Sequence, residues 1–448
     1  MCDAQRGPND LQAVIESKDK IIKKLRRQVK SPKQSSDDEA ASKRSSETSP
    51  AVSRQQKTAA FQGMVAYEKA EESRLIKNLI IDLKPLVAST LITPCLPAYI
   101  IFMCIRYCDH VNDDVKVRSL LHLSINGIKK AIKKRYNDIE CVTLWLSNTI
   151  RLLQLMKQYS GEEQYNKFNN AVQNEQCFRN FDLNEYRNII NDFIIQIYQN
   201  LIRIIDSKLQ TIVVGGMLEH ESLPSGVESR GGLRRQYSRE EQGSHNQYTL
   251  ETILKQLSIF RKVMDRYELD ANVIDMIYKQ TFHIIVSSTL NNLLLRKEMC
   301  HWSKGMQIRY NISEMEEWLR SQDLTKSGAI EQMENLVQVS LLLQLPKKSS
   351  DDVDKINSVC KKLNSQQIIK ILHLYTPVNE YEDKVSNEFI RKVDEKLKQR
   401  GELATHSNTL LMDSKYIYPV TFPYYPNKVA LETIPIPERL NLGFVKRL

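Results

Sequence analysis

The longest regular pattern in the chain lies between residues 182 and 216, and it restricts the fold more than any other stretch. Asp182 stands where a helix N-cap is favoured, and Glu185 follows at the third helical position. Apolar residues then recur at spacings of three and four until Gly215 and Gly216: Leu183, Tyr186, Ile189, Ile190, Phe193, Ile197, Leu201, Ile204 and Leu209. About 30 residues at 1.5 Å each predict a helix of roughly 45 Å. A helix of that length can be shared between two subdomains.

Composition favours helices elsewhere too. Only 14 glycines and 14 prolines are spread over 448 residues, and alternating apolar and polar runs are few, so a sandwich or an α/β sheet is disfavoured. The length exceeds what one core usually supports, which favours two subdomains. The predicted fold class is all-α. Helical periodicity predicts further helices over Glu71–Leu83, Pro97–Asp109, Val115–Arg135, Asp138–Tyr159, Ala329–Leu345, Asp351–Leu363, Gln366–Leu374 and Lys384–Arg400.

The C-terminal stretch has a different character. From Tyr416 onward, five prolines alternate with large apolar residues, and proline at this density forbids a helix. Because the stretch is too apolar for a free tail, we expect an extended strap lying across the folded body.

Three segments are not expected to belong to the folded body. Residues 1–30 hold a short heptad pattern, with Leu11, Val14, Ile21 and Leu25 at a and d positions, which predicts the end of a longer coiled coil. Residues 31–60 have the composition of a disordered linker, and residues 219–246 that of a flexible loop. Ser238 in this loop has the R-x-x-S spacing of a basophilic kinase site and is a possible phosphosite.

The stretch Trp302–Leu324 allows two interpretations. Asn311 or Ser313 is predicted to cap a helix whose first turn holds several glutamates, with Tyr310 in the turn just before it. Such a turn can present a binding surface. The alternative is a well-capped core helix anchored by Trp318.

Charge and cysteines narrow the classes of function. The formal net charge of +10 suggests either an acidic partner (nucleic acid, an anionic membrane or an acidic protein face) or simply a solvated basic surface. No nucleic-acid motif accompanies the charge, so nucleic acid is not expected. Eight cysteines lack paired spacing; Cys104, Cys108 and His110 are close in sequence, but zinc sites normally use tighter pairs. Reduced, buried thiols and no metal are expected, which fits the cytosol.

A run from Leu86 to Ile105 carries no charge and has the length of a membrane span. Pro94 and Pro97 interrupt it, so a buried helix from Pro97 is favoured and no transmembrane segment is expected. Phosphate-binding loops, dinucleotide fingerprints, zinc-protease and serine-hydrolase motifs are all absent. The chain is therefore predicted to be a binding module without a cofactor, not an enzyme.

Four strings resemble the globular tail, or dilute domain, of class V myosins: LNNLLLRKEMCHWSKGMQIRYNISEMEEWLR, ILHLYTPVNEYEDKVSNEFIRKV, LWLSNTIRLLQLMKQYSGEE and YPVTFPYYPNKVALETIPIP. The resemblance covers roughly Phe61 to Leu448. It implies an elongated rod of two helical-bundle subdomains bridged by the long helix, with the C-terminal segment packing back on the first. The implied division is 1–30 end of coiled coil, 31–60 linker, 61–218 subdomain 1, 219–246 loop, 247–402 subdomain 2 and 403–448 strap.

The resemblance also implies function. The family's tails bind vesicle and organelle adaptors and Rab-type GTPases, and they fold back on their own motor head to inhibit it. The implied location is cytoplasmic, with vesicles and actin, as a homodimer through the upstream coiled coil. A free-standing dilute-domain scaffold without a motor is the alternative, and the sequence preceding Met1 would discriminate between them.

Four residues carry over from the family's motifs. Tyr310 in the R-Y-N string and Gln344 in the following leucine-rich helix match a Rab-binding surface. Lys297 and Lys370 match a pair of lysines that docks on the motor head. The alternatives are that Tyr310 only packs its turn and that both lysines are solvated surface residues. Adaptor-binding residues on subdomain 1 do not carry over.

Overall fold

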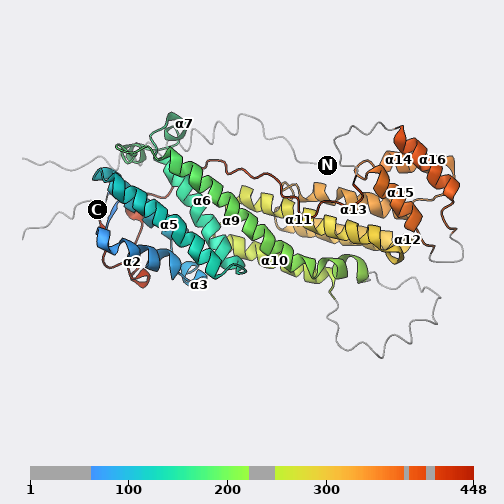
Figure 1. Ribbon diagram of the computed structural model, residues 1–448, viewed down its shortest axis with the longest axis horizontal. Coiled ribbons are helices and arrows are strands. Elements are labelled where there is room, and N and C mark those ends of the chain that lie inside the picture. Colours follow the sequence, from blue (N-terminus) through green and yellow to red (C-terminus); the bar gives the residue numbers. More distant parts are fainter. Residues whose placement is uncertain (1–61, 221–247, 378–382, 400–408) are drawn as a thin grey trace, which may run out of the picture. The chain divides into compact units, whose positions relative to one another are not determined.

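The computed structural model describes residues 62–220, 248–377, 383–399 and 409–448, all within one compact unit (Figure 1). Helices dominate these residues. The one sheet among them pairs the two-residue strands β1 (Val65–Ala66) and β2 (Lys446–Arg447) antiparallel, so the all-α prediction is confirmed. The predicted coiled coil, linker and phosphosite Ser238 lie outside the described residues, and the subdomain boundaries stay predictions.

The first helices follow the sequence pattern closely. The predicted helix over Glu71–Leu83 is shorter and continues as a π-helical turn, Lys77–Ile81. From residue 62 onward, seven α-helices precede the long one: α2 (Glu72–Ile76), α3 (Pro85–Ala88), α4 (Leu96–His110), α5 (Asp114–Lys134), α6 (Ile139–Gln158), α7 (Glu163–Asn166) and α8 (Ala171–Glu175). Nearly all of α4 is buried, which confirms a buried helix in place of a membrane span. Over the described ranges, no helix is both long and apolar enough to cross a membrane.

The long helix is α9 (Asn184–Gln210), and both of its predicted ends were wrong. Leu183 is its N-cap, while Asp182 lies one residue earlier and its carboxylate accepts a hydrogen bond from the Asn184 amide at 2.9 Å. The helix ends at Gln210 and a separate π-helical turn follows at Gly215–Glu219. A Cβ on Gly216 would lie 2.8 Å from the Thr249 carbonyl oxygen, so this glycine permits close packing and does not stop α9.

Two neighbours define the role of α9. It packs mainly against α6 from the first half of the chain and also against α11 (Ala271–Leu295) from the second half. The Tyr198 hydroxyl donates a hydrogen bond to the Met276 carbonyl at 3.3 Å across this second contact. The prediction of one long helix shared by the two halves is confirmed.

The second half holds a further set of helices besides α11: α10 (Leu250–Arg266), α12 (Trp302–Ser321), α13 (Ala329–Gln344), α14 (Ser350–Val359), α15 (Ser365–Leu374) and α16 (Asn387–Lys398). The helix predicted to reach Leu363 stops at Val359, because Asn364 caps α15 by accepting a hydrogen bond from Gln367.

The predicted helix start at Asn311 or Ser313 was wrong. The helix already begins at Trp302, with His301 as the N-cap accepting from the Lys304 amide at 3.2 Å. Asn311 is fully buried in mid-helix, where its side chain accepts from Gln307 and donates to the Met217 carbonyl. Its polar side chain therefore fixes a tertiary contact and caps nothing.

Trp318 has the anchoring role predicted for it. Its ring packs against Tyr278 with centroids 5.6 Å apart, and its indole nitrogen donates to Ser258 at 2.9 Å.

The strap has almost no regular structure, as predicted, and amide side chains hold its backbone. Gln280 on α11 donates to the Tyr416 carbonyl at 2.7 Å and accepts from the Tyr418 amide at 2.9 Å. Three more amides make the same paired contact: Asn291 with Met412, Gln154 with Pro423 and Tyr425, and Gln158 with Asn427. The strap therefore runs along α11 and then α6, with its backbone hydrogen bonds supplied by helices.

We expect Gln280→Met to destabilise the chain by about 1–3 kcal/mol, because it leaves a strap carbonyl and a strap amide without partners at a buried site. Urea unfolding measures the change. Gln199→Met, at an exposed position on α9, is the control and should change stability little. Equal stability of the two variants would contradict the role of the paired amide.

The corrected start of α12 gives a second prediction. Asn311→Ala should destabilise the chain by about 1–3 kcal/mol, because the Met217 carbonyl and Gln307 lose a buried partner. Ser313→Ala should be neutral or slightly stabilising, since Ser313 is exposed in mid-helix and alanine is the better helix former there. Thermal unfolding that showed Ser313→Ala as the more damaging change would restore the capping role.

Candidate partner-binding surface

The outer face of α12 exposes two large aromatic side chains. Tyr310 is 37% exposed and Trp302 is 42% exposed. They lie on the side opposite Ile308, Ile312 and Met315, which are buried against the rest of the fold. Tyr310 therefore projects from a rigid helix and not from the turn that the sequence predicted.

The Tyr310 side chain is free to meet a partner. Its hydroxyl makes no hydrogen bond to any residue that the structure describes, and Arg309 and Ser313 beside it are also exposed. An exposed tyrosine on a rigid helix offers large apolar area with a polar tip, the usual composition of an interface anchor.

The tight α12–α13 hairpin brings Gln344, the last residue of α13, next to Gly305 near the start of α12. A Cβ added to Gly305 would lie 2.8 Å from the Ser340 carbonyl oxygen and 3.1 Å from Cγ of Gln344, so only glycine allows this approach. Tyr310 is five residues further along α12, about 7.5 Å of helix rise from Gly305. The structure therefore places both predicted GTPase-binding residues on one hairpin.

Only one of the two polar groups of the Gln344 side-chain amide makes a hydrogen bond to a described residue. Its Nε2 donates to the Ser340 carbonyl at 3.0 Å, which holds the side chain along α13. Its carbonyl oxygen has no partner among the described residues, so an acceptor remains available at the surface.

The two predicted docking lysines border one turn. Lys297 is exposed in the 3-10 turn Lys297–Met299 between α11 and α12, and Lys370 is half-buried on α15. Cys300 lies between them: its amide donates to the Lys297 carbonyl at 3.1 Å, and its carbonyl accepts from Thr376, just after α15, at 2.8 Å. Burial raises the pKa of the Cys300 thiol to about 12, against the opposing positive charge of Lys370.

The acidic side chains near Lys297 pair with Arg296 and not with the lysine. Arg296, adjacent to Lys297, forms ion pairs with Glu219 at 2.7 Å and with Glu298 at 2.9 Å. Within the described ranges neither Lys297 nor Lys370 has an ion-pair partner. The pair is therefore a small positive surface next to the start of α12.

Trp302 was not among the predicted site residues, although the sequence contained a signal for it. Trp302, Met306 and Arg309 follow at spacings of four and three, on the side of the helix away from the buried stripe. The error in the helix start hid this face, because it placed all three residues outside the helix.

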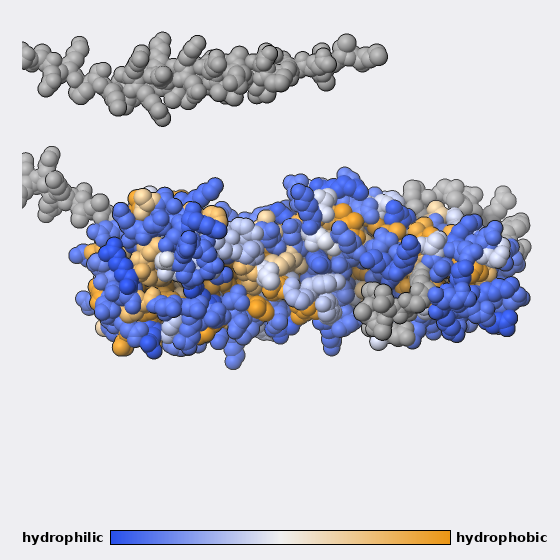
Figure 2. Space-filling model, turned by 90° about the horizontal axis from the view of Figure 1, so that it is seen from above, coloured by the Kyte–Doolittle hydropathy of each residue, from blue (hydrophilic) through white to orange (hydrophobic). Residues whose placement is uncertain are grey.

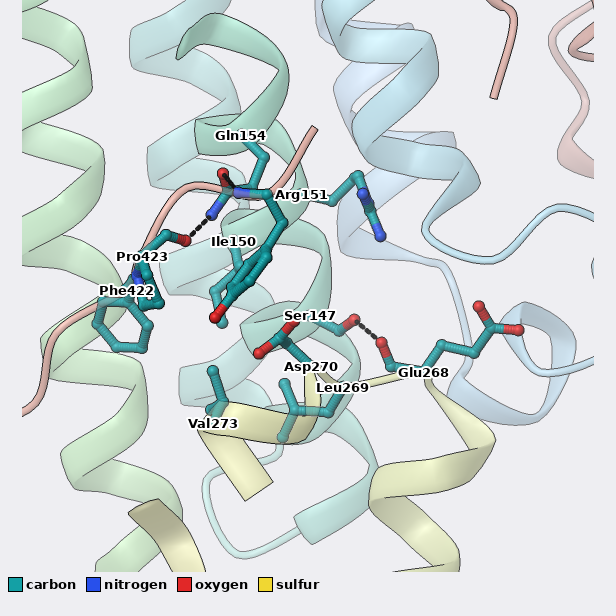
Figure 3. Close-up of a pocket in the computed structure, with 11 residues that line it drawn as sticks. Ser147, Ile150, Arg151, Gln154, Glu268, Leu269, Asp270, Val273, Phe422 and Pro423 are labelled. Atoms are coloured by element: carbon teal, nitrogen blue, oxygen red, sulfur yellow. Dashed lines mark hydrogen bonds between the residues drawn. The ribbon is translucent and has the colours of Figure 1, made fainter. Parts of the chain in front are cut away.

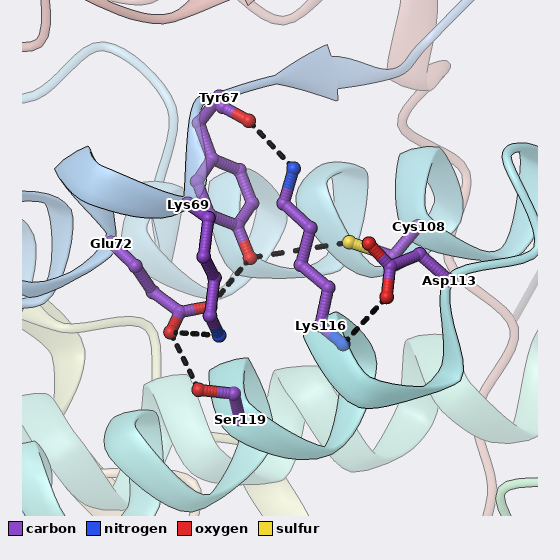
Figure 4. Close-up of polar contacts among 7 residues, drawn as sticks. All are labelled: Tyr67, Lys69, Glu72, Cys108, Asp113, Lys116 and Ser119. Carbon is purple, nitrogen blue, oxygen red and sulfur yellow. Dashed lines mark hydrogen bonds and ion pairs between the residues drawn. The ribbon is translucent and has the colours of Figure 1, made fainter.

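A buried polar cluster near the first strand resembles a catalytic site but is fully engaged (Figure 4). The Glu72 carboxylate accepts from the Tyr67 hydroxyl at 2.9 Å, from Lys69 at 2.6 Å and from Ser119 at 2.6 Å. Burial raises the pKa of the Tyr67 hydroxyl far above its ordinary value, so it remains a donor. The cluster joins the first strand, α2 and α5, and its role is structural.

The cysteines near this cluster do not belong to a group of metal-ligating side chains. The Cys108 thiol faces the Tyr67 hydroxyl at 4.0 Å, and no group of three metal-ligating side chains occurs in the described part of the chain. All cysteines described there are free thiols.

A cavity of about 190 Å³ lies where the strap crosses α6 (Figure 3). Two of the polar groups that line it hold neighbouring backbone: Gln154 donates to the Pro423 carbonyl at 2.9 Å, and Ser147 donates to the Tyr267 carbonyl at 2.8 Å. The cavity belongs to the junction between the strap and the helices. On the face shown in Figure 2, hydrophobic residues form separate groups among hydrophilic ones.

Comparison with known proteins assigns the family. Residues 276–379 match the DIL domain. The chain is 49% identical to human unconventional myosin-Va over 458 residues, which is 98% of this chain and 24% of that protein. It is 46% identical to human unconventional myosin-Vb over 448 residues, again 98% of this chain and 24% of the relative.

The fold is also similar to that of a solved structure. It is similar to Myo2-GTD, solved in complex with Mmr1, with a TM-score of 0.61 over 84% of this chain and 95% of that one at 18% identity. The chain spans about a quarter of the length of the curated relatives that it matches. The chain therefore belongs to the family of class V unconventional myosins, as a DIL-containing globular tail.

Proposed function

We propose that this chain is the cargo-binding and autoinhibitory tail of an actin-based class V myosin. It docks cargo adaptors and Rab-type small GTPases, and it also binds its own motor head when no cargo is present. The observation that carries the GTPase assignment is the pair Tyr310 and Gln344 on one rigid hairpin, each with an unused polar group at the surface.

Support for adaptor binding comes from a relative. Myo2-GTD, which has the same fold, has been solved in complex with Mmr1 and with Smy1. By analogy the chain would join a motor to vesicles in the cytoplasm, as a dimer formed through the coiled coil predicted at residues 1–30.

The proposed GTPase-binding surface combines an apolar group with a hydrogen-bond acceptor. The Tyr310 ring supplies apolar area, and the Gln344 carbonyl oxygen accepts a hydrogen bond from the partner. Since a helical hairpin holds both, little conformational entropy is lost when a partner binds. An effector must distinguish nucleotide states, so the partner's switch region is the expected contact.

We expect Tyr310→Ala to weaken binding of a GTP-loaded Rab-type GTPase by about 30-fold or more, which is the loss of a hot-spot anchor of about 2 kcal/mol. Pull-down or calorimetry with GTP-loaded and GDP-loaded Rab proteins measures it. Tyr136→Ala removes an exposed tyrosine far along the sequence and is the control. Equal binding of the two nucleotide states, or an unchanged Tyr310→Ala variant, would refute the effector role.

Autoinhibition would use the turn that holds the lysine pair. Lys297 is exposed and Lys370 is half-buried, and neither has an ion-pair partner among the described residues, so both are available to an acidic patch on the motor head. Contacts between exposed charges weaken as salt screens them, so inhibition should fall as ionic strength rises.

Added to the isolated motor head, the tail should lower its actin-activated ATPase, and Lys297→Ala/Lys370→Ala should abolish most of that inhibition. The matched control is Lys262→Ala/Lys326→Ala, which removes the same charge from two exposed positions elsewhere in this half of the chain. If both double variants inhibit like the unmodified tail, the docking assignment is wrong; if both fail equally, net charge alone is responsible.

A further inference from the structure

The charge-free run Leu86–Ile105 divides into two parts in the structure. Residues from Leu96 onward form α4 and are buried. The preceding loop, Pro85–Pro94, lies at the surface and exposes two aliphatic side chains: Leu86 is 72% exposed and Ile92 is 88% exposed. Ile92 is the most exposed large hydrophobic residue among those described.

The backbone at the tip of this loop is largely satisfied internally. The Ser89 amide donates to the Pro85 carbonyl at 2.9 Å, the Thr90 amide to Val87 at 3.2 Å and the Leu91 amide to Ala88 at 3.1 Å. The Ser89 and Thr90 hydroxyls bond back to carbonyls of the same short helix, α3. Exposed apolar side chains on a self-bonded turn are suited to an environment poor in water, where unpaired backbone groups are costly.

Basic side chains surround the base of the loop. Lys84 directly precedes it, and Arg135 at the end of α5 donates to the Leu83 carbonyl at 3.2 Å. The last turn of α5 adds the exposed Lys133 and Lys134. The acids of these segments are Asp82 and Asp138, and the Asp138 carboxylate accepts from the first amides of α6. Four basic groups against two carboxylates leave a surplus of two positive charges.

The loop is also anchored to the folded body. Arg439 of the strap donates to the Thr90 carbonyl at 2.6 Å and to the Thr90 hydroxyl at 2.9 Å. The aliphatic tip is thus held outward by the strap and α5, and its exposure is a feature of the folded structure.

We propose that the loop Pro85–Pro94 contacts an anionic membrane surface, with Leu86 and Ile92 entering the interfacial region and Lys84, Lys133, Lys134 and Arg135 meeting lipid headgroups. Protruding aliphatic side chains with adjacent positive charge bind such surfaces by combining apolar burial with electrostatic attraction. This contact is independent of the GTPase surface on α12. It would add a direct lipid contact to whatever protein adaptor holds the tail on a vesicle.

Co-sedimentation of the whole chain with phosphatidylcholine vesicles, with and without 30% phosphatidylserine, tests the proposal. We expect binding to the anionic vesicles and little to the neutral ones. Leu86→Ser/Ile92→Ser should weaken partitioning by about tenfold or more. Val115→Ser/Ile259→Ser, which alters two exposed aliphatic residues elsewhere, should bind like the unmodified chain.

Two further sets of variants measure the electrostatic attraction to the membrane and the insertion of the loop separately. Lys133→Gln/Lys134→Gln should weaken binding, whereas Lys262→Gln/Lys326→Gln should weaken it less. In an Ile92→Trp variant, anionic vesicles should shift the added tryptophan emission to the blue relative to the unmodified chain.

Several results would overturn the proposal. They are equal binding to neutral and anionic vesicles, normal binding by Leu86→Ser/Ile92→Ser, and an unshifted Ile92→Trp emission. Displacement from vesicles by free polyglutamate together with an unshifted emission would identify an acidic protein surface as the occupant instead. None of these outcomes depends on GTPase binding, so the proposed function can fail or hold separately.

Discussion

Paired hydrogen bonds between helix side-chain amides and the strap backbone are the interaction on which the fold depends. A proline-rich segment cannot form a ladder of its own, yet its buried amides and carbonyls still require partners. Gln280 and Asn291 on α11, with Gln154 and Gln158 on α6, each offer one donor and one acceptor and so imitate an adjacent strand. The strap can therefore lie across helices from both halves of the chain without a sheet.

The surfaces proposed for partners follow from this arrangement of rigid elements. The close contact at Gly305 aligns α12 with α13 and brings Gln344 to the end of α12 that presents Trp302. The turn before α12 carries Lys297, and α15 brings Lys370 to the same turn. A GTPase on α12 and a motor head on the lysines would occupy neighbouring surface. Each would then hinder the other, which is a direct physical route from cargo binding to release of inhibition.

Much of the fold could be predicted because helical periodicity and capping are local. α4, α5, α6, α13 and α15 begin and end within a few residues of the predicted positions. The errors occurred where a residue type has two uses. Asn311 resembles an N-cap but is a buried tertiary contact, and Gly216 resembles a helix stop but permits close packing against α10. Local sequence cannot distinguish these uses, because the deciding partners, Met217 and Thr249, are far away along the chain or on another element.

The sequence by itself determined the all-helical class, the extended strap, the family and the residues proposed to bind partners, since each rests on local pattern or on a long matching motif. Only the tertiary structure decided which of those residues face solvent and which lie together. It placed Tyr310 in mid-helix, joined the two lysines at Cys300, and left Leu86 and Ile92 exposed while the rest of the same apolar run was buried. Burial depends on what packs against a residue, and an apolar run carries no record of its future neighbours.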